Sequence, residues 1–155
     1  MPIDIATLLR TDLATFAPYT PIVPLDVLAK QLGIARDALV KLDANENPYG
    51  PTAATRAALA QLASIEGARD MVAIYPDPDN TELTQAIATH LGQAPARILC
   101  GNGSDEVIDL LLRATLSPGA AVIDASPTFG MYAYGTNLCQ GRVIDVPRDA
   151  QFDLD

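Results

Sequence analysis

The 155-residue sequence has no tryptophan, a single histidine and only two cysteines. Cys100 and Cys139 form no Cys-x-x-Cys pair and lie at no spacing typical of a metal site, so we predict no bound metal. We expect both thiols to be buried and reduced, as is usual in the cytoplasm.

Long apolar runs and basic clusters are missing as well. No stretch approaches the roughly 20 apolar residues needed to cross a bilayer. The first ten residues, MPIDIATLLR, carry an acid early and do not form a signal peptide. With 10 Lys and Arg against 19 Asp and Glu, the formal net charge is −9, and no basic stripe is available for nucleic-acid phosphates. We predict a soluble, cytoplasmic protein with neither membrane nor nucleic acid as a partner.

The composition that remains is globular, with 49% apolar and 19% charged residues. The first 50 residues are interrupted by prolines and contain one expected helix, residues 25–32, which ends at Gly33. This segment is typical of an arm with little core of its own.

Helical spacing begins at Pro51. Residues 51–65 have proline in the first turn and small apolar residues at helical intervals. A second helix follows the proline-rich turn, capped by Asp79 or Asn80 and closed by Gly92. We expect its buried stripe to be Leu83, Ala86, Ile87 and Leu91. His90 is better explained as a packed or C-terminally placed helix residue than as a catalytic base.

The last third of the chain alternates between strands and helices. Strands are expected at residues 97–100, 120–126 and 141–147, and helices at 104–116 and 128–139. This order predicts an α/β protein with a mostly parallel, buried sheet and helices on its faces. Ligands of such sheets bind at the carboxyl ends of the strands.

A glycine-rich turn, GNGSDE, follows the first of these strands. Gly101 and Gly103 are suited to a tight turn or to an anion held by backbone N–H groups at a helix start. We expect the helix to begin within about two residues of Ser104. A dinucleotide fingerprint is the alternative, since Asp124 matches the ribose-binding acid, but Glu106 stands where the third glycine belongs.

Four stretches stand in a fixed order: KLDANENPYGP (41–51), YPDPDNTEL (75–83), GNGSDEVIDLLLRA (101–114) and SPTFGMY (126–132). Together they resemble the N-terminal part of the histidinol-phosphate aminotransferase family, whose members are pyridoxal-phosphate enzymes of fold type I. The resemblance covers nearly the whole chain and includes FAPYTP in the arm. It implies an incomplete large domain, residues 51–155, preceded by an N-terminal arm and small-domain segment, residues 1–50.

The resemblance also implies roles for individual residues. In the family, the turn matching Gly103, Ser104 and Asp105 holds the cofactor phosphate, and the aromatic residue matching Phe129 stacks on the pyridine ring. The tyrosine matching Tyr75 reaches the phosphate of the neighbouring subunit, and the residues matching Tyr19 and Asn45 lie near the substrate. Without the family, Phe129 would be an ordinary core aromatic, Tyr75 a surface turn residue and Asn45 part of a turn.

By this resemblance the complete enzyme would be a homodimer that exchanges an amino group between L-histidinol phosphate and 2-oxoglutarate in histidine biosynthesis. The chain has only Lys30 and Lys41, and neither matches the lysine that binds the cofactor, so we assign no catalytic residue and expect no activity from these 155 residues alone. The alternatives are an aromatic aminotransferase, a threonine-phosphate decarboxylase, a nucleotide-binding module and a non-catalytic remnant.

Overall fold

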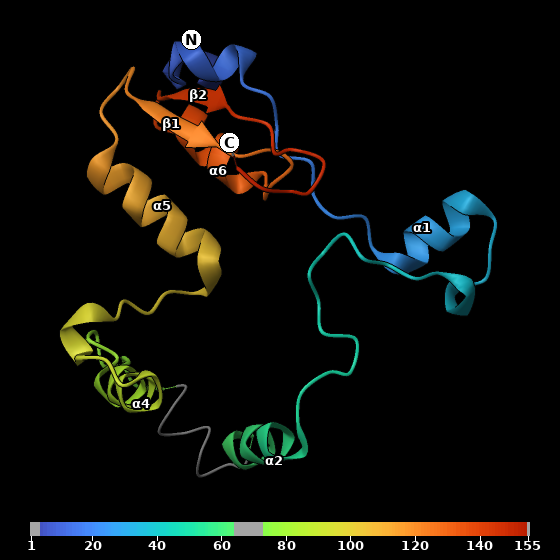
Figure 1. The fold of residues 1–155 in the computed structure, drawn as a ribbon, viewed down its shortest axis with the longest axis vertical. Coiled ribbons are helices and arrows are strands. Elements are labelled where there is room, and N and C mark those ends of the chain that lie inside the picture. The colour runs from blue at the N-terminus through green and yellow to red at the C-terminus, as the bar shows by residue number, and fades with distance from the viewer. Residues whose placement is uncertain (1–3, 64–72, 155) are drawn as a thin grey trace. The chain divides into compact units, whose positions relative to one another are not determined.

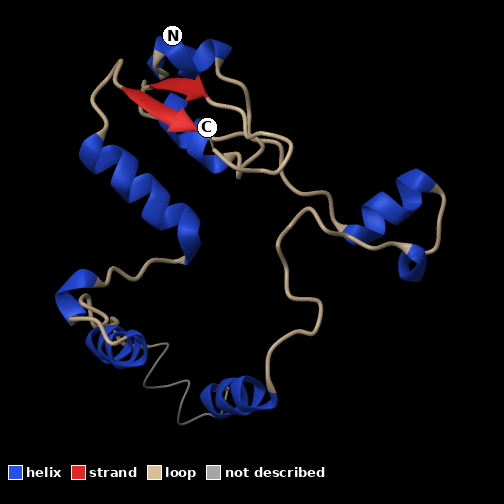
Figure 2. Ribbon diagram, in the orientation of Figure 1, coloured by secondary structure: helices blue, strands red, loops and turns tan. Residues whose placement is uncertain are grey.

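The computed structural model describes residues 4–63 and 73–154. They fall into two compact units, Met1–Tyr19 with Ala96–Asp155, and Thr20–Pro95. Figures 1 and 2 show their helices and strands. The predicted boundary at residue 50 stays a prediction.

A parallel pair of strands lies in the first unit. Strand β1 (Ala121–Asp124) pairs with β2 (Arg142–Asp145), so that Ala121 lies opposite Arg142 and Asp124 opposite Asp145. Helix α6 (Met131–Leu138) connects them (Figure 2), because parallel strands need a crossover rather than a hairpin. These three elements confirm the predicted strand–helix–strand order, with each element shorter than expected. The predicted burial of the sheet is wrong: the residues of both strands are exposed or half-buried, and Ile123 is 69% exposed. The arm adds two 3₁₀ helices, Ile5–Leu8 and Thr11–Thr15.

Close packing in this unit occurs where helix α5 (Gly103–Thr115) meets α6. Thr136 is fully buried, and its hydroxyl donates to the carbonyl of Tyr132 at 2.7 Å. A Cβ atom on Gly135 would lie 2.7 Å from Cδ1 of Leu112. Only glycine lets the two helices approach this closely at that point.

The predicted strand at residues 97–100 is wrong. A 3₁₀ turn, Pro95–Arg97, is followed by irregular chain up to α5, and Leu99 is exposed. A strand exists only when a neighbour completes its hydrogen bonds. The two described strands pair with each other and with no third strand.

The predicted helices of the second unit are confirmed. They are α1 (Leu25–Leu32), α2 (Ala53–Leu62) and α4 (Thr81–Leu91); residues 64 and 65 of the prediction lie outside the described residues. Gly33 and Gly92 end α1 and α4 in the left-handed conformation, which glycine adopts at little cost. A short 3₁₀ helix, Arg36–Ala38, packs on α1.

The predicted buried stripe of α4 is wrong. Leu83, Ala86 and Leu91 are exposed and Ile87 is half-buried, whereas the buried residue is Ala88. Amphipathic spacing selects a face, but burial needs another element against that face. His90 is exposed in the last turn of α4. Of the two explanations predicted for it, the C-terminal position is confirmed and the packed position is not.

Two predictions from composition can be compared with the structure. Cys100 and Cys139 are half-buried, so the prediction that both thiols are buried is wrong. Within residues 4–63 and 73–154, no helix has the length and apolar character to span a membrane.

Candidate functional site

The glycine turn leads directly into helix α5. The helix begins at Gly103, which confirms the predicted start near Ser104. Gly103 has φ +81°, and a Cβ atom on Gly101 would lie 2.9 Å from Cγ2 of Val107. Both positions therefore favour glycine, one for its backbone angle and the other for space.

The acidic residue Glu106 is turned back toward the turn. Its carboxylate accepts hydrogen bonds from the backbone N–H of Asn102 and, at 3.1 Å, from the Asn102 side-chain amide. The first N–H groups of an α-helix have no acceptor within the helix, and the positive end of the helix dipole lies there. The N–H groups of Ser104 and Asp105 at this end of the helix are suited to an anion. In this structure the carboxylate of Glu106 lies at the turn, so it would have to turn aside before an anion could bind there.

Phe129 lies in the connection between β1 and α6, two residues before the helix. The residue is 41% exposed, and its ring meets the ring of Tyr132 edge-on, with centroids 6.1 Å apart. This edge-on contact leaves surface of the Phe129 ring on which a flat partner can stack.

Arg148 fixes the same connection, although no motif in the sequence points to this residue. Its backbone N–H donates to the carbonyl of Ser126 at 2.7 Å, and its Nε donates to the carbonyl of Ala125 at 3.2 Å. These contacts attach the start of the loop that carries Phe129 to the chain that follows β2.

Tyr19 belongs to the first unit as well. Its ring lies edge-on to Tyr134 of α6, with a centroid distance of 5.8 Å, and Phe16 contacts the same ring at 5.2 Å. The glycine turn, Phe129 and Tyr19 thus all belong to one compact unit.

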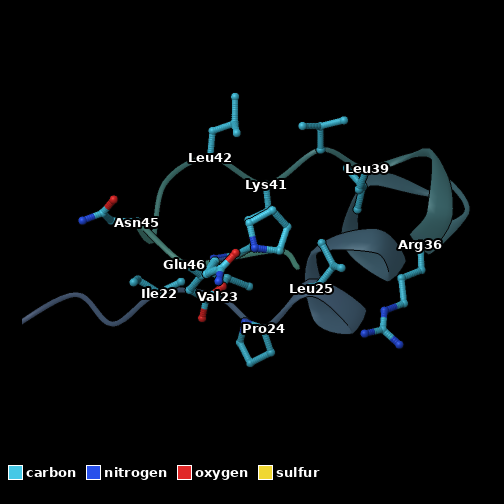
Figure 3. Close-up of a pocket in the computed structure, with 13 residues that line it drawn as sticks. Ile22, Val23, Pro24, Leu25, Arg36, Leu39, Lys41, Leu42, Asn45 and Glu46 are labelled. Atoms are coloured by element: carbon cyan, nitrogen blue, oxygen red, sulfur yellow. The ribbon is translucent and has the colours of Figure 1, made fainter. Parts of the chain in front are cut away.

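The other predicted residues lie in the second unit. Tyr75 is 98% exposed, so its hydroxyl meets solvent in this structure. Asn45 has φ 52° and lines an open hollow of ≈ 1170 Å³ between the chain before α1 and residues 39–48 (Figure 3). Asparagine tolerates this left-handed angle better than most residues.

Both lysines also lie in the second unit. Lys30 is on α1, and Lys41 lines the hollow and pairs with Asp43 at 2.8 Å. The hydrogen bond from Lys41 lowers the pKa of Asp43 below its usual value. The ammonium group of Lys41 therefore already forms an ion pair with a neighbouring carboxylate.

The turn before α4 is built differently from the sequence-based expectation. Asp77, rather than Asp79 or Asn80, holds this turn: its carboxylate accepts from the N–H groups of Thr81 at 2.8 Å and Asp79 at 3.0 Å. Asn80 itself makes no capping hydrogen bond with its side chain. Hydrogen bonds from the side chain and backbone of Thr81, and from the backbone of Asp79, lower the pKa of Asp77. The turn that follows Tyr75 is thus a defined structure.

Comparison with known proteins decides the family. The model of the family described as aminotransferase class I and II matches residues 37–155. The chain belongs to this family. The glycine turn and Phe129 fall within the matched region, and the membership decides against the dinucleotide alternative.

Individual aminotransferases show the same relationship. The chain is 53% identical to histidinol-phosphate aminotransferase of Roseiflexus castenholzii over 156 aligned residues, which cover 100% of the chain and 41% of that relative. The chloroplastic histidinol-phosphate aminotransferase of Nicotiana tabacum is 43% identical over 95% of the chain and 34% of its own length. The chain therefore spans well under half the length of these relatives.

A solved structure agrees on the fold. The crystal structure of histidinol-phosphate aminotransferase from Sinorhizobium meliloti in complex with pyridoxal-5'-phosphate matches with a TM-score of 0.72 and 28% identity, over 92% of this chain and 35% of that one. The chain thus has part of the fold type I architecture of pyridoxal-phosphate-dependent aminotransferases, as predicted.

Proposed function

We propose that the chain is the N-terminal part of a histidinol-phosphate aminotransferase, which exchanges an amino group between L-histidinol phosphate and 2-oxoglutarate in histidine biosynthesis. The observation that carries this proposal is the 53% identity to the Roseiflexus enzyme over the whole chain. We further propose a homodimer that acts in the cytoplasm.

The glycine turn fits the phosphate of pyridoxal phosphate. The backbone N–H groups of Ser104 and Asp105 and the hydroxyl of Ser104 would bind its oxygens. Gly103 permits the backbone angle that opens the turn. The carboxylate of Glu106, which is bonded to Asn102 at this turn, would turn aside to make room for the negatively charged phosphate. When bound, the cofactor supplies an electron sink, while protein groups place and tune it.

Phe129 would orient the cofactor ring by stacking. Phe129 offers a stacking surface and has no hydroxyl for a further contact. Tyr75 would donate its hydroxyl to the phosphate in the neighbouring subunit, a role that suits a side chain exposed in a single chain. Tyr19 and Asn45 would form part of the substrate wall.

The base that moves the substrate proton would come from outside these 155 residues. Lys41 is paired with Asp43, and an ammonium group held in an ion pair is a poor nucleophile. The 155-residue chain alone should therefore not catalyse transamination.

The test uses the complete enzyme that contains this chain. Purified with pyridoxal phosphate, it should convert L-histidinol phosphate with 2-oxoglutarate and prefer this donor to aromatic amino acids. A preference for aromatic amino acids, or carbon dioxide release from threonine phosphate, would assign it to another fold type I activity.

A second measurement addresses the 155-residue chain. It is incubated with pyridoxal phosphate and reduced with borohydride, and labelled lysines are mapped by mass spectrometry. We expect no stoichiometric label on Lys30 or Lys41. Site-specific labelling together with turnover of histidinol phosphate would contradict the proposed inactivity.

A further inference from the structure

Helix α6 ends in the first unit, where its last carbonyl groups need hydrogen-bond donors. The final four carbonyls of an α-helix have no partner within the helix. Three accept from the backbone that follows: Gly135 from Cys139 (3.0 Å), Asn137 from Gln140 (2.9 Å) and Thr136 from Gly141 (2.8 Å). The fourth, Leu138, accepts from Nη2 of Arg10 at 2.9 Å. A residue of the arm thus completes the end of the helix.

The guanidinium of Arg10 is oriented by Asp12. Nη2 lies 2.6 Å from Oδ2 and Nε lies 3.1 Å from Oδ1 of this carboxylate. Two parallel hydrogen bonds fix the plane of a guanidinium, which a lysine ammonium does not reproduce. The positive charge also lies at the carboxyl end of α6, where the helix dipole favours it.

The same arm segment contacts α6 a second time. Phe16 and Tyr19 both lie edge-on to Tyr134, which is half-buried in the middle of the helix. Residues 10–19 are therefore attached to α6 at two points, one polar and one aromatic. The hydrogen bond from Arg10 to Leu138 restricts how far Phe16 and Tyr19 can move relative to Tyr134.

We propose that Arg10, oriented by Asp12, is a positioning residue that anchors residues 10–19 on α6 and so sets the place of Tyr19 in the substrate site. The role of Tyr19 rests on the proposed function, whereas the anchoring rests on the hydrogen bonds and ring contacts between the arm and α6. Arg10 acts through the arm and does not itself touch the substrate.

The test is made on the complete enzyme with Arg10→Ala, Arg10→Lys and the control Arg113→Ala. Arg113 pairs with Asp109 on its own helix at 2.8 Å, so the control removes an arginine–aspartate pair that does not involve the arm. In Arg10→Ala, amide hydrogen exchange of residues 13–19 and 139–141 should rise by about threefold to tenfold, as expected for one charge-assisted hydrogen bond. In Arg113→Ala it should stay unchanged in both segments.

Kinetics give the second readout. In Arg10→Ala, KM for the amino donor should rise by about threefold to tenfold while kcat changes by less than about twofold, the pattern expected when substrate placement is lost. Arg10→Lys should lie between the wild type and Arg10→Ala, since the charge stays and the paired hydrogen bonds are lost. Asp12→Asn should give the same pattern with a smaller rise in KM. If Arg10→Ala does not fold, Asp12→Asn takes its place in both measurements.

Each outcome decides one part of the proposal. Unchanged exchange in residues 13–19 would overturn the anchoring whatever the substrate of the enzyme is. Raised exchange with an unchanged KM would overturn the link to Tyr19. If the enzyme does not accept histidinol phosphate, the proposed function fails, while the exchange measurement still tests the anchor.

Discussion

The two units of the chain differ in the range of the contacts that hold their side chains. In the first unit, contacts join residues far apart in sequence, such as Arg10 with Leu138 and Phe16 with Tyr134. In the described part of the second unit, the side-chain contacts join near neighbours, such as Asp77 with Thr81.

This difference explains why helices form in both units while apolar side chains are less covered in the second. Local hydrogen bonds and caps suffice to start and end a helix. They do not bury its apolar face, and Leu83 and Leu91 of α4 remain exposed. Tyr75 of the same unit is 98% exposed. The second unit thus presents residues for contacts that it does not make by itself.

The largest effect is expected from Tyr75→Phe in the complete enzyme. If a neighbouring subunit covers this side chain, loss of the hydroxyl should weaken cofactor retention by roughly 1.5–3 kcal/mol, the value of a charge-assisted hydrogen bond. The measurement is the dissociation constant of pyridoxal phosphate. Tyr49→Phe, at another tyrosine that is 91% exposed, is the control and should leave retention unchanged.

Mixed dimers sharpen this test. A Tyr75→Phe subunit combined with a subunit that lacks the cofactor lysine should regain activity, because one site then has both groups. Heterodimers that form and stay inactive would show that Tyr75 does not act across the interface.

A substitution in the first unit should disturb long-range packing. A Cβ atom at Gly141 would lie 2.5 Å from Cδ2 of Leu116 and 3.1 Å from the carbonyl oxygen of Thr136. Gly141→Ala should therefore lower the free energy of unfolding by about 1–3 kcal/mol, as overpacking does. Gly130→Ala is the control, since nothing lies within 4 Å of its Cβ position. Equal urea denaturation midpoints for the two variants would contradict tight packing here.

A cap in the second unit should have a smaller and more local effect. The hydroxyl of Thr52 accepts from the N–H of Thr55 at 3.2 Å at the start of α2. Thr52→Ala should cost about 1 kcal/mol and raise amide exchange mainly within α2. Thr89→Ala, inside α4, should change stability by less than about 0.5 kcal/mol. An effect of Thr52→Ala that spreads to the first unit would show that the two units are coupled.

The smallest effect concerns pH. Hydrogen bonds from Thr81 and Asp79 lower the pKa of Asp77 from its ordinary 3.8, so the folded state binds the proton less readily than the unfolded state. The stabilisation is therefore complete above pH 3.8 and declines as the pH falls through the folded-state pKa. The protection factor of the Thr81 amide, which is the intrinsic exchange rate at each pH divided by the observed rate, should fall over that acidic range, and Asp77→Asn should abolish this fall. A protection factor that does not change with pH in the wild type would contradict it.

The sequence by itself determined the local elements and the motifs. Prolines, glycines and helical spacing predicted α1, α2, α4, α5 and α6, because the start and end of a helix depend on nearby residues. It also located the glycine turn, since the left-handed angle at Gly103 is a property of one residue type. The order of the four motifs along the chain was enough to indicate the family.

Only the tertiary structure decided which elements lie against one another. The expected strand at residues 97–100 lacked a described neighbour, and the expected stripe of α4 lacked a covering surface, since pairing and burial need a second element that local pattern does not specify. For the same reason no motif revealed that Arg10 completes the end of α6, 128 residues further along the chain. A hydrogen bond between distant residues depends on how the chain folds back, and that is fixed by packing rather than by spacing in the sequence.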